Sequence, residues 1–241
     1  MAGMSDGQPR EIVSRRARPA KAPLNREVIV AAALDILACD GLAGLSLRRV
    51  ATALDTGPAS LYVYLSNLDE LHALMLDSAL AAVKSPSARR GSWSERLKVL
   101  LKEYLRVLYE RPGLAQIALS TIACGPHSVR ISELLLGLLK EGGVDDIKTA
   151  WGVDLLTLYV TAIAVEQNLR AGGDDLGRVT AALDAVSIEE FPLVFAAKQA
   201  LLSGGGEGRS DWALDVIISG ITGGPNPPVK LQPPRRKGRK K

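Results

Sequence analysis

The sequence predicts an all-α protein in two parts: a small N-terminal domain built around three helices, and a larger helical C-terminal domain. Apolar residues recur at three- and four-residue intervals along most of the chain, which is typical of helices with one buried face. No segment shows the strict alternation bounded by tight turns that marks a β-hairpin. The 241 residues are 47% hydrophobic and rich in Ala and Leu, so the chain can bury a substantial helical core.

Basic residues are concentrated at the two ends of the chain. Residues 1–23 hold five basic and two acidic side chains, and residues 224–241 hold seven basic and none acidic. The net charge of +4 therefore conceals a net charge of about −6 over residues 24–223. We predict a disordered basic arm at 1–23 and a disordered basic tail at 223–241. Such ends attract phosphate backbones, although solubilising ends without a partner are equally consistent with the pattern.

Several function classes lack support in the sequence. The N-terminus has no apolar signal core, and no apolar run is long and uncharged enough to span a bilayer. Cys39 and Cys124 form neither a metal-binding pattern nor a disulfide framework. We therefore expect a cytoplasmic protein with no membrane partner, no metal and no cofactor.

Residues 24–84 are predicted to form a helix-turn-helix domain. A first helix begins after Asn25, whose side chain can cap it, and ends at Gly41. Ser46 caps a second helix, residues 55–57 form a turn, and Pro58 begins a third helix that reaches residue 65. A fourth helix, capped by Ser66 or Asn67, runs to about residue 83. This is the arrangement that places one helix in the major groove of DNA.

The third helix carries an unusual set of outward residues. Leu61 and Leu65 share its inward face, which leaves two tyrosines and a valine on the remaining sides. These side chains fit a face that DNA covers, because tyrosine hydroxyls bond phosphates and small apolar groups contact thymine methyls. The alternative is that the tyrosines pack into the protein core.

Residues 92–222 are predicted to form the second, helical domain, after a linker at 84–91. Ser92 and Glu95 have the spacing of a capping box. Helices are expected at 92–110, 114–122, 128–142, 145–171, 176–186, 189–202 and 211–221, with a flexible glycine-rich loop at 203–209.

The second domain contains no catalytic or metal-binding constellation, so we expect a binding domain rather than an enzyme. Amphipathic residues in apolar surroundings are its candidate ligand contacts: Tyr104, Tyr109, Trp151, Tyr159, Glu166 and Gln167. Tyr104 is also consistent with plain core packing, and Glu166 with a solvated or dimer-spanning carboxylate. The apolar faces of helices 145–171 and 211–221 are the dimer candidates, with packing inside one chain as the alternative.

Residues 24–76 resemble the N-terminal DNA-binding domain of the TetR family of bacterial transcriptional regulators. The segments IVAAALDILACDG, LAGLSLRRVATAL and ASLYVYLSNLDEL carry the resemblance. It implies a homodimer on a palindromic double-stranded DNA operator, and a small-molecule effector in the C-terminal domain that alters DNA affinity. It also implies a set of DNA-facing residues: Arg48, Thr56, Ala59, Ser60, Tyr62 and Tyr64.

Two positions depart from the family pattern. Asp55 stands where the turn usually has glycine, and Leu68 stands where a lysine often contacts phosphate. Residues 24–84 also hold seven acidic and only four basic side chains. We therefore expect Arg15, Arg16 and Arg18 of the basic arm to supply DNA contacts, for example in an adjacent minor groove.

The function that the sequence predicts is a ligand-responsive transcriptional repressor. The alternative is a helical small-molecule-binding module without specific operator recognition. Specific binding to the DNA upstream of its own gene distinguishes the two.

Overall fold

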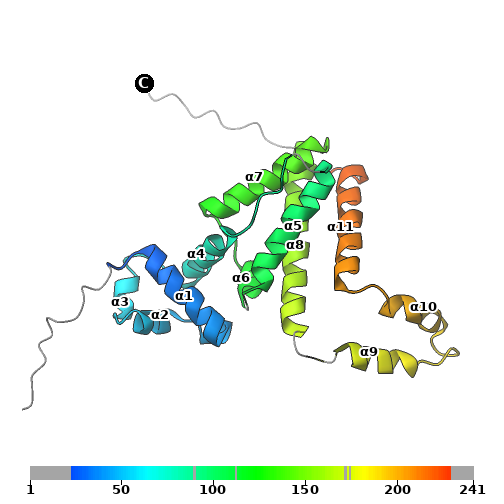
Figure 1. The fold of residues 1–241 in the computed structure, drawn as a ribbon, viewed down its shortest axis with the longest axis horizontal. Helices are drawn as coiled ribbons and strands as arrows, with labels where there is room; N and C mark the ends of the chain where they lie inside the picture. The colour runs from blue at the N-terminus through cyan, green and yellow to red at the C-terminus, as the bar shows by residue number, and fades with distance from the viewer. Residues whose placement is uncertain (1–22, 89–90, 112, 171–172, 174, 229–241) are drawn as a thin grey trace, which may run out of the picture.

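The computed structural model describes residues 23–88, 91–111, 113–170, 173 and 175–228. Within these ranges the chain forms eleven α-helices and no strand, which confirms the all-α prediction. Figure 1 shows α1 to α4 gathered at one end of the molecule, and α5 to α8 with α11 forming the larger body.

The N-terminal domain contains α1 (Arg26–Asp40), the single turn η2 (Leu42–Gly44), α2 (Leu47–Ala53), α3 (Pro58–Leu61) and α4 (Leu68–Leu80). The side chains of Asn25 and Ser46 accept the backbone N–H groups of Val28 and Arg49 at 2.8 and 3.2 Å. Both predicted caps are therefore confirmed. Asn67 caps α4 by accepting the Glu70 N–H at 2.8 Å, which decides between the two candidate caps.

The third helix is shorter than predicted, because α3 ends at Leu61 and residues 62–64 form a turn. The N–H groups of Tyr64 and Leu65 both donate to the Leu61 carbonyl, at 2.9 and 3.0 Å. A β-branched valine between two aromatic residues has low helix propensity, which explains the early end. Leu61 and Leu65 are buried as predicted.

The C-terminal domain is organised around one long helix, α8 (Asp146–Arg170). It packs against α5 (Trp93–Tyr109), α6 (Leu114–Ser120), α7 (Pro126–Glu141) and α11 (Gly206–Gly223). By length and composition α8 is apolar enough to cross a membrane, contrary to the expectation that no segment would be. Its apolar residues instead meet four other helices, as expected of the central helix of a bundle.

Several helix boundaries in this domain differ from prediction. The helix predicted at 189–202 begins at Pro192, and the helix predicted at 114–122 ends at Ser120. α7 begins at Pro126 rather than after Ser128, whose hydroxyl donates to the Gly125 carbonyl at 2.8 Å. α11 begins at Gly206, so most of the predicted glycine-rich loop is helical. The Arg209 side chain donates to the Ser203 carbonyl at 2.9 Å and ties the start of α11 to the end of the preceding helix.

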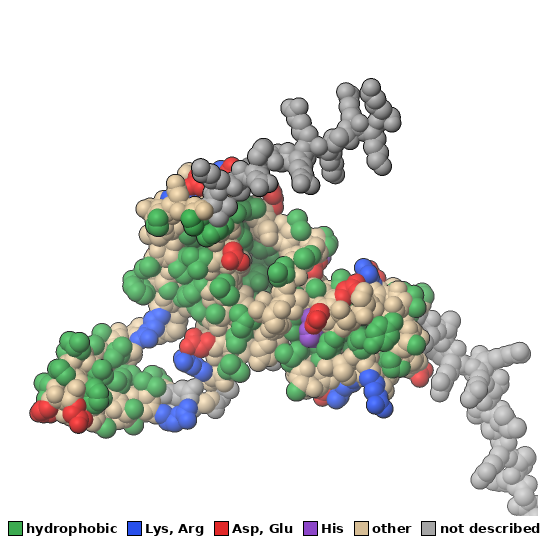
Figure 2. Space-filling model, turned by 180° about the vertical axis from the view of Figure 1, so that it is seen from behind, with side chains coloured by type: hydrophobic (Ala, Val, Ile, Leu, Met, Phe, Trp, Pro, Cys, Tyr) green, Lys and Arg blue, Asp and Glu red, His purple; other side chains and the backbone are tan. Residues whose placement is uncertain are grey.

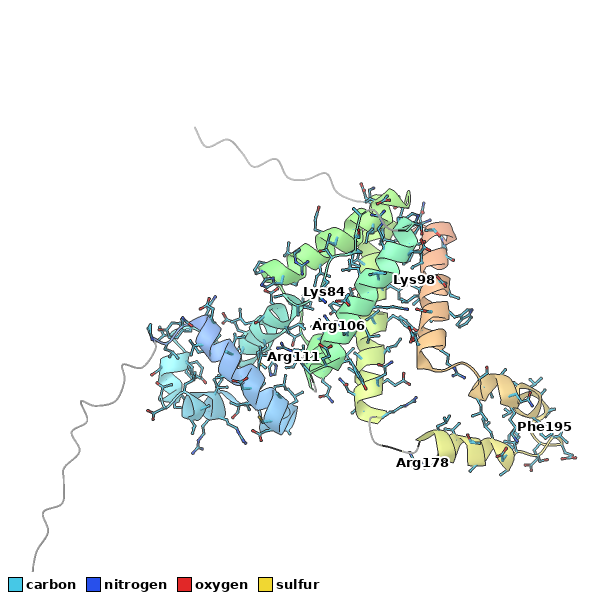
Figure 3. All side chains as sticks on the ribbon, in the orientation of Figure 1. Lys84, Lys98, Arg106, Arg111, Arg178 and Phe195 are labelled. Carbon is cyan, nitrogen blue, oxygen red and sulfur yellow. The ribbon has the colours of Figure 1, made fainter. Side chains whose placement is uncertain are left out.

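The helices α9 (Asp175–Asp184) and α10 (Pro192–Leu202) form an arm that projects from the body (Figure 1). α10 has no buried residue. The arm exposes large apolar side chains: Leu176, Val179, Ile188, Phe191, Leu193, Phe195 and Leu201. Figure 2 shows hydrophobic side chains covering the arm, and Figure 3 marks Phe195 at its outer part.

Candidate DNA-reading surface and effector cavity

The turn between α2 and α3 has the left-handed residue that its geometry requires. Asp55 has φ of 50°, the one positive φ of a non-glycine residue in the described part of the chain. Aspartate adopts this conformation at lower cost than most residues, so the turn forms without the usual glycine. The Thr56 N–H donates to the Ala51 carbonyl at 2.9 Å, and Pro58 occupies the first position of α3.

The residues proposed to face DNA come from α2, this turn and the α3 region. Arg48, Ala59 and Tyr62 are exposed, whereas Thr56, Ser60 and Tyr64 are half-buried. Tyr62 is 59% exposed, so it does not pack into the core, but Tyr64 does pack partly against the core. Val63, 79% exposed, is the most exposed apolar side chain of this surface.

The two neighbouring arginines of α2 differ in their availability. Arg49 forms an ion pair with Asp40 at 2.5 Å. Arg48 is exposed, and its guanidinium pairs with no carboxylate among the described residues. The geometry therefore leaves Arg48 available to a phosphate.

Arg26 and Glu70 form a brace, called here the Arg26 brace. It holds Tyr64 and Ser66, at the end of the segment that runs from the α2–α3 turn to α4 (the DNA-reading segment). The Arg26 Nε donates to the Tyr64 carbonyl at 2.9 Å, and its second nitrogen donates to Glu70 Oε1 at 3.0 Å. Glu70 Oε2 accepts the Ser66 N–H at 2.7 Å. This backbone donor, followed by the Arg26 charge, lowers the pKa of Glu70 below its ordinary value. The sequence did not predict the brace, although a glutamate three residues after a capping asparagine is a signal of this kind of contact.

Two other expectations concern phosphate contacts. Arg15, Arg16 and Arg18 lie outside the described residues. Leu68 is half-buried against the core, so it stabilises the domain and supplies no charge in place of a lysine.

A reciprocal α4–α7 latch, which the sequence did not predict, joins the two domains. Asp77 of α4 is buried, and its carboxylate accepts the N–H groups of Ser128 and His127 at 2.8 and 3.4 Å. Arg130 of α7 donates to the Val83 carbonyl at 2.9 Å, just past the end of α4. The acidic Asp77 therefore lies at the N-terminus of α7 and the basic Arg130 at the C-terminus of α4, where the helix dipoles favour these charges.

The linker adds a further contact at this junction. Arg106 of α5 donates to the Ala82 carbonyl at 3.3 Å and pairs with Glu103 and Glu110. Figure 3 shows Arg106 near Lys84, where the chain passes from α4 to α5.

A cavity of about 350 Å³, the candidate effector cavity, lies beside the latch. Leu76 and Leu80 of α4 form part of its wall, together with residues of α5, α7, α8 and the segment that follows α6. The predicted ligand contact Tyr104 lines it, as does Thr161 of α8. Burial raises the pKa of Tyr104, so its hydroxyl is protonated at neutral pH.

The other predicted ligand contacts line different cavities. Tyr109, Tyr159, Glu166 and Gln167 line a cavity of about 480 Å³ between α8 and the start of α11. Glu166 forms an i, i+4 ion pair with Arg170, and burial raises the pKa of Tyr159. Trp151 lines a third cavity with Ile221 and Pro225. The predicted residues therefore do not form one pocket, because they occupy different faces of α5 and α8.

Residues 85–223 match the family model described as the tetracyclin repressor-like C-terminal domain, which is more than half of the chain. The chain belongs to the TetR family. Family membership confirms the resemblance that residues 24–76 carry, and TetR-family proteins are transcriptional regulators rather than enzymes. The match begins at residue 85, within the segment expected to link the two domains.

Solved TetR-family structures have the same fold. Apo ActR from Streptomyces coelicolor is 36% identical and matches with a TM-score of 0.78, over 85% of this chain and 98% of that chain. ActR in complex with actinorhodin is 35% identical, with a TM-score of 0.76 over 83% and 96% of the two chains. ActR has also been solved in complex with (S)-DNPA.

Curated TetR-family relatives match over shorter stretches. The HTH-type transcriptional repressor DrrR1 of Streptomyces coeruleorubidus is 33% identical over 154 residues, 62% of this chain and 57% of the relative. An HTH-type transcriptional regulator of Saccharopolyspora erythraea is 32% identical over 120 residues, 50% and 51% of the two chains. The chain thus spans about half the length of the curated relatives that it matches.

Proposed function

We propose that this chain is a ligand-responsive repressor that binds a palindromic operator as a homodimer. A small molecule in the effector cavity alters its affinity for DNA. The observation that carries the proposal is that α4 contacts both the DNA-reading segment and the effector cavity. Glu70 near its start accepts the Ser66 N–H and pairs with Arg26, which holds the Tyr64 carbonyl of the DNA-reading segment, and Leu76 and Leu80 line the cavity.

The latch supplies a physical route from ligand to DNA. Ser128 lines the effector cavity, and its N–H holds the Asp77 carboxylate of α4. A ligand that displaces the first turn of α7 therefore changes the position at which α4 is held. Because the Arg26 brace couples the start of α4 to Tyr64, movement of α4 carries the reading segment with it. Two sites linked through one helix in this way have the physical connection that allosteric coupling between ligand and DNA needs.

We propose that α8 and α11 of two copies form the dimer interface. Trp151, Leu155 and Leu158 of α8 and Trp212 and Val216 of α11 are exposed apolar residues on neighbouring antiparallel helices (Figure 1). Figure 2 shows hydrophobic side chains gathered over this part of the body as well as over the arm. Leu214, Ile218 and Ile221 are instead buried within the chain. Large exposed apolar side chains on neighbouring helices are typical of an interaction surface.

The relatives support the proposal. DrrR1 is named as a repressor, and ActR has been solved with two different small molecules bound. A regulator that acts on bacterial DNA works in the cytoplasm, which is where we place this protein.

A mobility-shift titration on the DNA upstream of its own gene tests the proposal. We expect the full-length protein to shift this duplex, and to lose the shift when one half of the palindrome is scrambled. Added effector is expected to change the midpoint of the titration. Small-molecule binding without any sequence-specific shift would favour the alternative, a ligand-binding module that does not recognise an operator.

A further inference from the structure

The effector cavity has an unusual number of hydroxyl groups on its wall. Seven hydroxyl side chains line it: Tyr104, Ser120, Thr121, Ser128, Ser132, Thr157 and Thr161. One carboxylate, Asp154 of α8, lies among them. These polar groups come from α5, α6, α7, α8 and the segment after α6, where apolar residues such as Ile131 and Leu135 lie between them, whereas the side formed by α4 is entirely apolar.

Most of these hydroxyls already use their hydrogen within the protein. Ser128 and Ser132 donate to the carbonyls of Gly125 and Ser128, at 2.8 and 3.0 Å. Thr157 donates to the Val153 carbonyl at 2.8 Å. Ser120 likewise donates to a carbonyl one turn earlier in α6, at 3.1 Å. A hydroxyl has one hydrogen and two lone pairs, so each of these four groups offers the cavity acceptor positions.

The charge of the wall, like its lone pairs, favours a ligand that donates hydrogen bonds and carries a positive charge. Ionised carboxylate oxygens only accept hydrogen bonds. Asp154 forms no ion pair with a described residue, and no Lys, Arg or His is found among the described residues of the wall. A ligand anion would therefore meet lone pairs and a like charge, with no cation to offset its desolvation.

The position of Asp154 strengthens this preference in the dimer. On α8 it is flanked by Leu155 and lies one turn from Trp151 and Leu158, which belong to the proposed dimer stripe. Asp154 is itself exposed, so covering the neighbouring stripe with a second copy would remove water from around its carboxylate. Coulomb interactions grow stronger as water is removed, so a charge that is screened in one copy acts on the ligand in two.

We propose that the effector of this protein is a cationic, donor-rich amine. Its ammonium group faces Asp154, and its other N–H or O–H groups donate to Ser128, Ser132 and Thr157. This inference rests on the proposed function, since it assumes that the effector cavity is the ligand site. It predicts that a carboxylate of the same skeleton binds poorly.

Three tricyclic probes test the charge preference on the full-length dimer without DNA. Proflavine is a cation with two amino groups, acridine is neutral at pH 7.5, and acridine-9-carboxylate is an anion. By isothermal titration calorimetry we expect proflavine to bind at least tenfold more tightly than the carboxylate, with acridine between them. The D154N substitution is expected to weaken proflavine binding at least fivefold and to change acridine binding less than twofold.

The matched control is D35N, which removes an exposed carboxylate from α1 and should leave the order of the three affinities unchanged. Equal affinities, tighter binding of the carboxylate, no binding of proflavine, or an equal effect of D35N and D154N would overturn the inference. A parallel operator shift on the same preparation separates this result from the proposed function. If the protein prefers the amine but does not shift the operator, only operator recognition is overturned. If it shifts the operator but does not prefer the amine, only the ligand class is overturned.

Discussion

Two adjacent arginines of α2 differ in their availability to DNA because only one of them has a carboxylate neighbour. Arg48 and Arg49 look equivalent in the sequence, yet Asp40 neutralises Arg49 and leaves Arg48 exposed. Sequence periodicity places both on the outer side of α2. The ion pair depends on how α1 ends beside α2, which periodicity does not reveal.

The Arg48→Ala substitution is expected to weaken operator binding about three- to tenfold for all sequences alike and to lower the salt slope by about one. Fluorescence anisotropy at several salt concentrations measures both quantities. Arg49→Ala serves as the control, because the cation it removes is already paired. If the two variants lose the same affinity and the same salt slope, Arg48 makes no privileged phosphate contact.

His72 of α4 gives the protein a defined response to acid. Its Nε2 is buried without a hydrogen-bond partner, and burial lowers its pKa below 6.5 despite the opposing effect of Asp69. The unfolded chain therefore binds this proton more readily than the folded protein does. The contribution to stability is complete above about pH 6.5 and is lost as the pH falls toward the lowered pKa.

Urea unfolding at a series of pH values checks this sign. The free energy of unfolding of the wild-type protein should fall between about pH 7 and pH 5. In the His72→Leu variant the same decline should be shallower. Parallel curves for the two proteins would assign the acid sensitivity to other groups.

At the scale of elements, the helix starts were the most predictable feature. Asn25, Ser46 and Ser92 cap helices as the sequence indicated, because a cap depends on residues three positions apart. The start of α7 was mispredicted for the opposite reason. Its N–H groups are held by Asp77, which lies about 50 residues away in the sequence.

Gly125 is the residue on which the latch depends sterically. A Cβ atom at this position would lie 2.2 Å from the Asp77 carboxyl carbon, so Gly125→Ala must displace the carboxylate from α7. We expect the free energy of unfolding to fall by about 1–3 kcal/mol, as for a buried polar group left unpaired. Denaturant titration measures the change.

The control for this prediction lies on the same helix. Gly137 of α7 has no atom within 4 Å of the corresponding Cβ position. Gly137→Ala should raise stability by about 0.5–1 kcal/mol, since alanine is the better helix former. A Gly125→Ala variant as stable as the wild-type protein would show that the latch adapts without cost.

For the whole molecule, the sequence indicated the two-part plan but not the grouping of the ligand candidates. Tyr104, Tyr159 and Trp151 all lie on apolar stripes, yet they face three different cavities. Periodicity identifies which residues of a helix are inward. It does not tell which neighbouring helix each one meets, because that depends on packing between distant segments.

The proposed dimer makes a prediction at this scale. Trp212 of α11 is 68% exposed, and Trp212→Glu places a charge on the stripe that a second copy would cover. Light scattering after gel filtration should report a monomer, with operator binding weakened at least a hundredfold because two half-sites are no longer held together. Val99→Glu alters a similarly exposed apolar residue of α5, outside the stripe, and should remain dimeric. A dimeric Trp212→Glu protein would exclude this interface.

The cavity between α8 and the start of α11 has a consequence for protein engineering. Residues before the arm, Glu166 and Arg170, line the same cavity as Gly206 and Ser210, which follow it. The chain therefore leaves the body for the arm and returns to it at neighbouring points, as expected of an insertion between α8 and α11. Loop-closure entropy changes by only about 0.6 kcal/mol for each doubling of length. The segment between α8 and α11 should therefore tolerate grafting or shortening into a plain helical hairpin while the cores of both domains stay intact.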